Sequence, residues 1–143
     1  MSSERRTSLL MCRNGEFFIY FILYRLYLTL CRSSAELFLF LKELKGDPAI
    51  GSYILDIRGR GLMVGVEFAS PQSSYSVLSD NGKWPRNMAA RVAKKCIEKG
   101  MLILTTSVYE VIRFIPPLNI SKEDMKKGCE IFAESVRDVV KEG

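Results

Sequence analysis

The alternation of apolar and polar residues becomes regular from about residue 34 onward. Over about 35–45, apolar side chains recur at the spacing of one helix face, at Leu37, Phe38, Leu41 and Leu44. Ser33 or Ser34 is a suitable N-cap for such a helix, and Gly46-Asp47-Pro48 is a suitable end. The pattern therefore predicts a helix over about 35–45.

The middle of the chain predicts a strand, a loop and a second helix. Residues 62–68 (LMVGVEF) form a near-continuous apolar run, which is typical of a buried strand. Residues 69–85 are rich in Ser, Pro, Asn, Asp and Gly, which indicates a loop. A helix follows over about 86–99, with Pro85 near its start and Gly100 as its C-cap. Its apolar positions form two neighbouring rows: Met88, Val92 and Cys96, and beside them Ala89, Ala93 and Ile97.

The last third predicts two short strands and a long helix. Met101–Leu104 is a short apolar run that predicts a buried strand, and residues 105–110 connect it to a possible hairpin partner. Tyr109–Ile115 predicts a further strand, which Pro116-Pro117 ends. Ser121 opens the last helix, with Asp124 at the third helical position as in a capping box. One stripe of this helix is apolar: Met125, Cys129, Phe132, Val136 and Val139.

The order of these elements indicates one compact domain over residues 32–143. From residue 34 it runs helix, strand, helix, strand, strand, helix. The strands are short and several are consecutive, so we expect an α/β fold of the α+β, two-layer kind. This fold is a small, mainly antiparallel sheet with helices on one face.

Residues 1–31 differ in character from the rest of the chain. Residues 17–31 are dense in aromatic residues and leucine, with Arg25 in the middle. A membrane-spanning helix needs about 20 apolar residues with few or no charges, so a span is not expected. Arg5, Arg6 and Arg13 before an apolar run resemble the start of a signal peptide, but no clean cleavage site follows. A targeting or membrane-surface segment, a buried helix, and a segment foreign to the following domain all stay open.

The composition excludes several chemistries. The chain has no histidine, which removes the commonest general base and metal ligand. The four cysteines, Cys12, Cys31, Cys96 and Cys129, have no paired spacing, so we expect buried free thiols and no metal site. Of the net charge of +5, residues 1–31 contribute +2, and the remaining +3 is spread over 112 residues with Lys and Glu interspersed and no basic cluster. Nucleic acid is therefore not an expected partner.

Two stretches about 50 residues apart are more specific than any periodicity. They are DIRGRGLMVGVEF at 56–68 and VIRFIPPLNISKED at 111–124, supported by 87–102 and 136–143. Together they resemble the C-terminal small domain of class III pyridoxal-phosphate (PLP) dependent aminotransferases. Within that class the chain is most similar to fungal members of the 4-aminobutyrate aminotransferase type. The resemblance covers about 32–143 and leaves 1–31 unmatched.

Arg113 is the candidate substrate-binding residue. It lies in an apolar strand just before Pro116-Pro117, where an arginine must reach solvent or find an anion. The resemblance implies that Arg113 lies at the active-site entrance and meets a substrate carboxylate or a gating glutamate of the large domain; a structural acid is the alternative. Arg58 and Arg60 are expected in structural or inter-domain salt bridges. Gly59 and Gly61 indicate a turn, and Gly65 indicates a close backbone approach.

The resemblance implies amino-group transfer from a 4-aminobutyrate-like amino acid to a 2-oxo acid, with PLP as cofactor. The family's Schiff-base lysine lies in its large domain, upstream of the matched region, so we expect this chain alone to bind no PLP and to be inactive. Expected partners are that large domain or a homo-oligomer, in the cytoplasm or mitochondria. A free-standing binding or regulatory module and a membrane-tethered domain are the alternatives.

Overall fold

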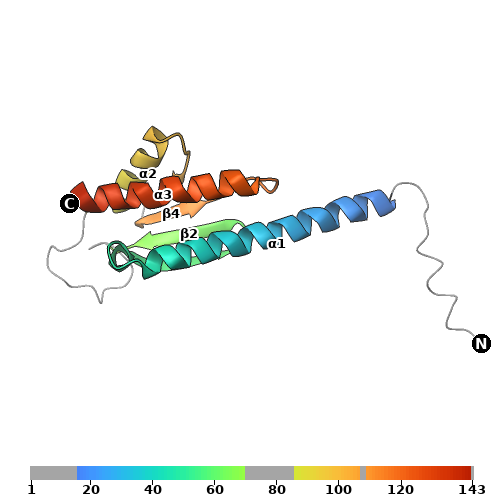
Figure 1. Cartoon of the computed structure of the whole chain (residues 1–143), viewed down its shortest axis with the longest axis horizontal. Helices are drawn as coiled ribbons and strands as arrows, with labels where there is room; N and C mark the ends of the chain where they lie inside the picture. The colour runs from blue at the N-terminus through green and yellow to red at the C-terminus, as the bar shows by residue number, and fades with distance from the viewer. Residues whose placement is uncertain (1–15, 70–85, 107–108, 143) are drawn as a thin grey trace, which may run out of the picture.

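The computed structural model describes residues 16–69, 86–106 and 109–142, with side chains from residue 19. The helices are α1 (Glu16–Gly46), α2 (Met88–Glu98) and α3 (Lys122–Glu142), with a short 3-10 turn, η2 (Gly51–Tyr53). The strands are β1 (Ile54–Arg60), β2 (Met63–Phe68), β3 (Leu104–Thr105) and β4 (Val111–Phe114). Figure 1 shows the sheet beside α3 and the C-terminal part of α1, while the N-terminal part of α1 extends past the body.

The four strands form one antiparallel sheet in the order β1-β2-β4-β3. The expected α+β fold is therefore confirmed, with β3 and β4 paired as a hairpin. The sequence prediction had no strand at β1. This strand carries two arginines and a glycine and lies at the sheet edge, so only its first residue, Ile54, is fully buried and the apolar alternation is weak.

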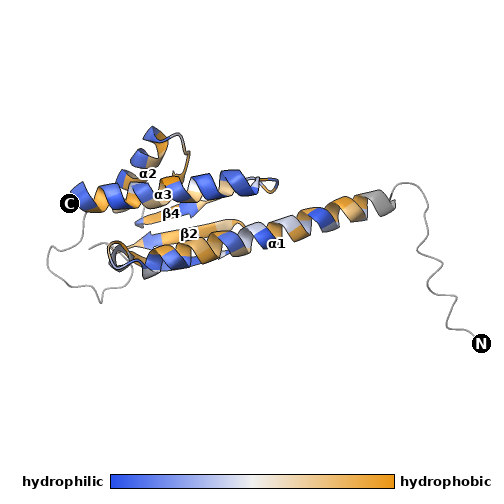
Figure 2. Ribbon diagram, in the orientation of Figure 1, coloured by the Kyte–Doolittle hydropathy of each residue, from blue (hydrophilic) through white to orange (hydrophobic). Residues whose placement is uncertain are grey.

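The core lies between the sheet and the helices. The predicted stripe of α3 is buried along its whole length, and Phe132 packs edge-on against Phe114 with ring centroids 4.8 Å apart. Leu37, Leu41 and Leu44 of α1 are also buried, as predicted. The second row of α2 was only partly right, because Ile97 is exposed while Ala89 and Ala93 are buried. Figure 2 shows hydrophobic and hydrophilic segments alternating along the ribbon of α3.

The start of α1 differs from the prediction. The helix begins at Glu16 and runs without a break through residue 32, so Ser33 and Ser34 are not its N-cap. The Ser34 hydroxyl instead donates a hydrogen bond to the carbonyl oxygen of Gly61, at 2.7 Å. This bond ties the helix to the β1–β2 turn. The apolar run before Ser34 obeys no single-face pattern, which is why helical periodicity did not reveal it.

The other helix ends follow the sequence more closely. Ser121 caps α3: its hydroxyl accepts from the Asp124 N–H at 3.0 Å and donates to the Asp124 carboxylate at 2.8 Å. The C-cap residue of α2 is Lys99, and the predicted Gly100 follows it with φ +85°, the left-handed conformation that often ends a helix. The α2 start uses a tertiary contact, because the buried carboxylate of Glu110 accepts from the Ala89 N–H at 2.8 Å. Pro85 and most of the predicted loop lie outside the described residues.

The predicted buried strand at Met101–Leu104 is wrong. The observed strand, β3, begins only at Leu104, and Leu102 is 83% exposed. Of the four residues only Ile103 is buried. This segment pairs on one side only, at the edge of the sheet, so its apolar residues do not all meet the core.

Candidate functional site

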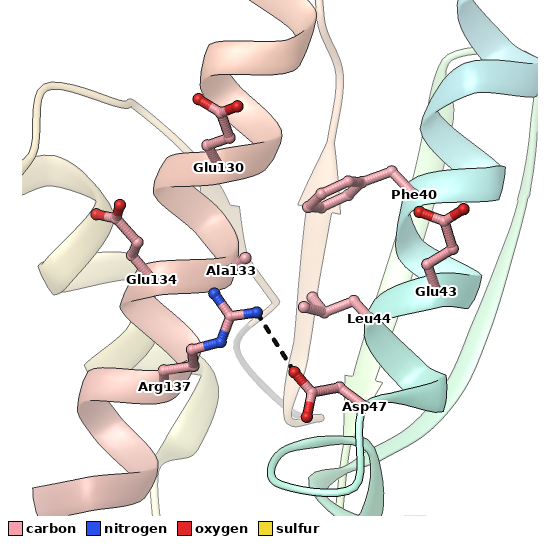
Figure 3. Close-up of a pocket in the computed structure, with 8 residues that line it drawn as sticks. All are labelled: Phe40, Glu43, Leu44, Asp47, Glu130, Ala133, Glu134 and Arg137. Carbon is pink, nitrogen blue, oxygen red and sulfur yellow. Dashed lines mark hydrogen bonds and ion pairs between the residues drawn. The ribbon is translucent and has the colours of Figure 1, made fainter.

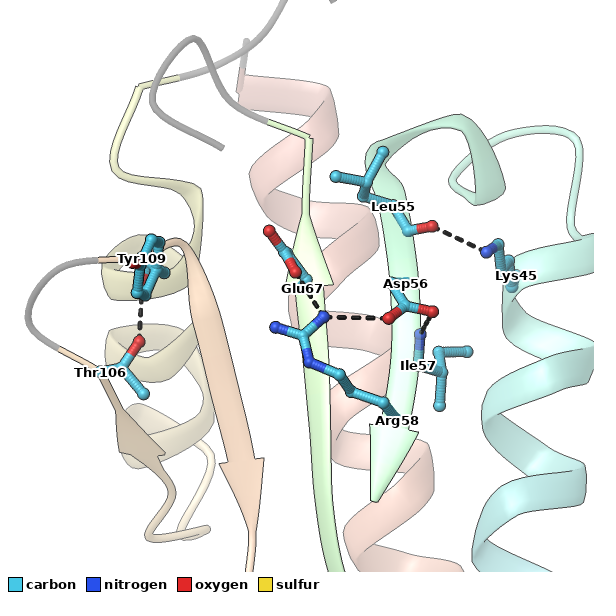
Figure 4. A network of polar contacts seen from close by, with 8 residues as sticks. All are labelled: Lys45, Leu55, Asp56, Ile57, Arg58, Glu67, Thr106 and Tyr109. Carbon is cyan, nitrogen blue, oxygen red and sulfur yellow. Dashed lines mark hydrogen bonds and ion pairs between the residues drawn. The ribbon is translucent and has the colours of Figure 1, made fainter. Parts of the chain in front are cut away.

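The site is built on the sheet face turned away from the helices. Strand register places Arg58 opposite Gly65, Gly65 opposite Arg113, and Arg113 opposite Leu104. Residues in one cross-strand row point to the same face of a sheet. Two arginines therefore lie in one row on this face, separated by a strand that contributes only a glycine. Figure 4 shows Arg58 on the side of the sheet opposite the helices.

Arg58 is held by two carboxylates. Its Nη1 donates to Asp56 Oδ2 at 2.9 Å and also to Glu67 Oε2 (Figure 4). Glu67 is almost completely buried, with 1% of its surface exposed. Hydrogen bonds to Glu67 and then Asp56 raise the pKa of Arg58. The expected structural salt bridge is therefore confirmed for Arg58. Arg60 is exposed and has no carboxylate partner among the described residues.

Arg113 has a different environment. It is exposed on β4, and no carboxylate within the described residues pairs with it. Thus the structural acid that sequence reasoning kept as an alternative is not seen in this part of the chain. Arg113 lines a hollow of about 240 Å³ together with segments 101–103 and 114–117 and the first turns of α3. An exposed guanidinium can donate two parallel hydrogen bonds to a carboxylate.

Residues near the two arginines stabilise the connections between the strands. The Thr106 hydroxyl donates to the carbonyl oxygen of Tyr109 at 2.8 Å and so closes the β3–β4 connection (Figure 4). Gly61 has φ +60°, and a Cβ at Gly59 would lie 2.2 Å from the Met63 carbonyl oxygen. Both glycines are needed for the predicted turn.

Gly65 does not make the close backbone approach that the sequence suggested. A Cβ there would lie 3.4 Å from Val111 Cγ1 and 3.6 Å from the Arg58 carbonyl oxygen, which are ordinary contacts. In the row Arg58–Gly65–Arg113, the glycine places no side chain between the two arginines.

The described residues do not fit PLP. An imine-forming lysine needs a lowered pKa or a desolvated pocket. Lys95 pairs with Glu142 at 2.7 Å and Lys99 with Asp138 at 2.8 Å, and these carboxylates raise both lysine pKa values. Lys122 and Lys126 are exposed side chains in surface ion pairs. No step of PLP chemistry can be assigned to this part of the chain.

The thiols and carboxylates of the described residues form no further cluster to which chemistry can be assigned. Cys96 and Cys129 are buried free thiols, as predicted, and burial raises the pKa of Cys129 to about 11. Cys31 is exposed, against the expectation of a buried thiol, and Cys12 lies outside the described residues. Within the described ranges, no group of three or more cysteine, aspartate or glutamate residues is arranged to hold a metal.

Sequence reasoning did not find the hollow between α1 and α3, of about 280 Å³ (Figure 3). Arg137 donates to Asp47 across it at 3.3 Å. A hydrogen bond from the Ala49 N–H, together with Arg137, lowers the pKa of Asp47. Glu43, Glu130 and Glu134 lie at the rim. The pair links two helices, and the surrounding carboxylates are exposed, so we assign this hollow no chemistry.

The fold and the arginine-bearing face define a small α+β domain. The model of the class III aminotransferase family matches residues 29–136. The chain therefore belongs to the class III aminotransferases, whose chemistry depends on PLP.

Curated relatives agree with this assignment. The alanine/serine racemase of Pyrococcus horikoshii is 32% identical over 101 residues, covering 70% of this chain and 19% of that protein. The acetylornithine aminotransferase of Clostridium acetobutylicum is 34% identical over 84 residues, covering 59% of this chain and 17% of that protein. The chain thus spans about a fifth of the curated relatives it matches.

Solved structures share the fold. The ornithine aminotransferase of Toxoplasma gondii superposes with a TM-score of 0.65 and 27% identity, covering 83% of this chain and 24% of that one. The N-acetylornithine aminotransferase of Stenotrophomonas maltophilia gives a TM-score of 0.65 at 19% identity, covering 83% of this chain and 28% of that one.

Among the helices in the described ranges, none combines the length and the apolar character that a membrane span requires.

Proposed function

We propose that residues 32–143 act as the small domain of a class III aminotransferase. The reaction is PLP-dependent transfer of an amino group from an amino acid to a 2-oxo acid. Two observations support this role. The chain belongs to the family but covers only about a fifth of the length of its relatives, and no lysine among the described residues suits PLP. On this proposal the cofactor and its lysine come from a large domain, and residues 1–143 alone are inactive.

The observation that carries the proposal is the contrast between the two arginines of one sheet row. Arg58 is already satisfied by two carboxylates, whereas Arg113 is exposed and pairs with no carboxylate of the described residues. We assign Arg113 the binding of a carboxylate, either of the substrate or of a glutamate on the large domain. Gly65, the residue between the two arginines in this row, has no side chain that would obstruct such a group.

For the amino donor we propose the 4-aminobutyrate class. This choice rests on the resemblance of 56–68 and 111–124 to that type of enzyme. The curated relatives named above act, by their names, on alanine or serine and on acetylornithine. A donor comparison therefore belongs in the test.

The test is a chimera in which residues 32–143 replace the matching segment of the Clostridium acetobutylicum enzyme. We expect the chimera to bind PLP and to transaminate, because the segment supplies the same structural unit. Arg113→Gln should raise KM for the carboxylate substrate about 10-fold or more, since a hydrogen bond to a charged group contributes roughly 1.5–3 kcal/mol. Arg60→Gln, an exposed arginine on the same face, is the matched control and should leave KM unchanged.

The chimera also separates the parts of the proposal. A folded, PLP-loaded chimera without turnover contradicts the small-domain role. Turnover with equal KM values for the Arg113→Gln and Arg60→Gln variants contradicts the role of Arg113 alone. Rates with 4-aminobutyrate and with acetylornithine decide the donor.

A further inference from the structure

The N-terminal half of α1 exposes more apolar surface than any other part of the described chain. Of residues 19–28 only Arg25 is not apolar, and the other nine side chains are 39–71% exposed. They are Ile19, Tyr20, Phe21, Ile22, Leu23, Tyr24, Leu26, Tyr27 and Leu28. A helix that is apolar on nearly all sides is normally buried. Figures 1 and 2 show this half extending past the sheet and α3.

This surface continues a face that is buried elsewhere in the same helix. Leu37 and Leu44 are covered by the body, and Leu30, one heptad before Leu37, is half-buried beside Gly61. The same stripe runs back from Leu30 through Leu26, Leu23 and Ile19 at intervals of four, three and four residues. On the N-terminal side of Leu30, no described element packs against this stripe. The stripe is therefore uncovered only in the N-terminal part of α1.

A second seam runs along the same half of the helix. Tyr20, Tyr24, Tyr27 and Cys31 are separated by four, three and four residues, and all four are exposed. Residues four positions apart in a helix lie on the same face, so Tyr27 and Cys31 are neighbours along this seam. Four-three spacing is the pattern by which two helices pack along their length. Tyrosine is also enriched at protein interfaces, because it offers a large apolar ring and a polar tip.

The exposed area is large enough for a stable interface. An aromatic side chain buries about 200 Å², so the nine half-exposed side chains present at most on the order of 900 Å², summed over all sides of the helix. A standard protein–protein interface takes about 800 Å² from each partner, so an association that covers most of the helix reaches that size. Monomeric proteins rarely leave a continuous apolar patch of this size uncovered.

The chemistry of the helix favours one occupant. A helix that lies on a lipid surface needs a separate charged face. Residues 19–31 carry Arg25 as their only charge, and its guanidinium lies 5.5 Å from the centre of the Phe21 ring. This segment therefore has no charged face. No described helix suits a membrane span. Residues 19–28 also precede the segment that the family shares. A second copy of this chain brings an identical seam, which a two-fold axis makes self-complementary.

We propose that residues 19–31 of α1 pack along the same residues of a second copy through the seam Tyr20, Tyr24, Tyr27 and Cys31. The association does not depend on the aminotransferase role. It leaves the sheet face that carries Arg113 free, because the seam lies on the part of α1 that extends past the body.

The test is the mass of the full chain in solution, measured by light scattering after gel filtration in reducing buffer. We expect a discrete multiple of the 16.3 kDa chain, with two copies as the smallest. Tyr24→Lys should shift the mass toward the single chain, and the triple variant Tyr20→Lys, Tyr24→Lys, Tyr27→Lys should give the single chain alone. Tyr109→Lys, at an exposed tyrosine of the body, is the matched control and should keep the wild-type mass.

Several results would overturn the proposal. They are a wild-type chain of single mass at every concentration, a triple variant that keeps the wild-type mass, or a broad mixture of large masses without a discrete species. A single-mass chain that binds phosphatidylcholine–phosphatidylserine vesicles would identify a lipid surface as the occupant instead. Circular dichroism of each variant shows whether the body has stayed folded, because the core residues of α1 begin only at Leu37.

Discussion

The two halves of α1 have the same kind of leucine stripe and opposite environments. From Leu37 to Leu44 the stripe is covered by the sheet and α3, whereas from Ile19 to Leu26 it is exposed. Helical spacing alone does not determine burial, because burial depends on what the rest of the chain places beside the helix. The body therefore carries the stability of this chain, and the N-terminal half of α1 carries a surface that needs a partner.

The largest expected effect is the loss of unfolding free energy when a core side chain is truncated, compared with truncation in the N-terminal half of α1. Phe132→Ala removes a fully buried ring that contacts Phe68 and Phe114, and should lower the free energy of unfolding by about 3–5 kcal/mol. Leu23→Ala removes an exposed side chain and should change it by about 0.5 kcal/mol or less in dilute solution. Urea unfolding followed by circular dichroism measures both. Similar losses for the two variants would show that the N-terminal half is part of the core.

A smaller effect tests how the body holds α2. The Glu110 carboxylate accepts a hydrogen bond from the Ala89 N–H at the positive end of α2. Glu110→Gln keeps the shape of this side chain but removes its negative charge. We expect a loss of about 1 kcal/mol in unfolding free energy, comparable to the loss of an N-cap. Ser121→Ala at the α3 cap is the comparison and should cost about the same. No change in the Glu110→Gln variant would mean that another group caps α2.

The smallest expected effect is a pH dependence confined to the body. Hydrogen bonds from Lys99 and Lys95 lower the pKa values of Asp138 and Glu142. Stabilisation by a lowered carboxyl pKa is present above the ordinary pKa near 4 and is lost as pH falls through the folded value. The lysine pKa values are raised, so their contribution is lost only as pH rises above about 10.5.

Unfolding curves between these limits should therefore show a plateau and a shallow fall on the acid side. The fall should shrink in high salt, because the pairs are solvent-exposed. Residues 19–31 contain no carboxylate, so the mass of the assembled chain should not follow this acid transition. A parallel loss of association across the same pH range would contradict the separation of the two regions.

The sequence predicted those parts of the fold whose pattern is local. The α3 stripe and its Ser121 cap were correct, because a single helix face with polar surroundings is visible in spacing alone. β1 was missed, since an edge strand containing Arg58 and Gly59 has weak alternation. For residues 17–31 a buried helix was only one of three open alternatives, because a segment that is apolar on all sides has no face to detect; the segment is helical, continuous with the next helix, and exposed over 19–28.

The candidate site was predictable in part for a related reason. Arg113 stands out in the sequence as a charge within an apolar strand. The pairing of Arg58 with Glu67, by contrast, depends on the register across the β1–β2 turn, and the Glu110 contact joins elements that are distant in the chain. Such tertiary contacts become visible only once the strands are placed.

The most direct test of the difference between the two regions is amide hydrogen exchange of the full chain over a range of protein concentrations. We predict that amides of 37–44 exchange slowly at every concentration, because the body protects them. Amides of 19–28 should exchange fast in dilute solution and become protected as the concentration rises. Protection of 19–28 equal to that of 37–44 at the lowest concentration, or no change with concentration, would contradict the account.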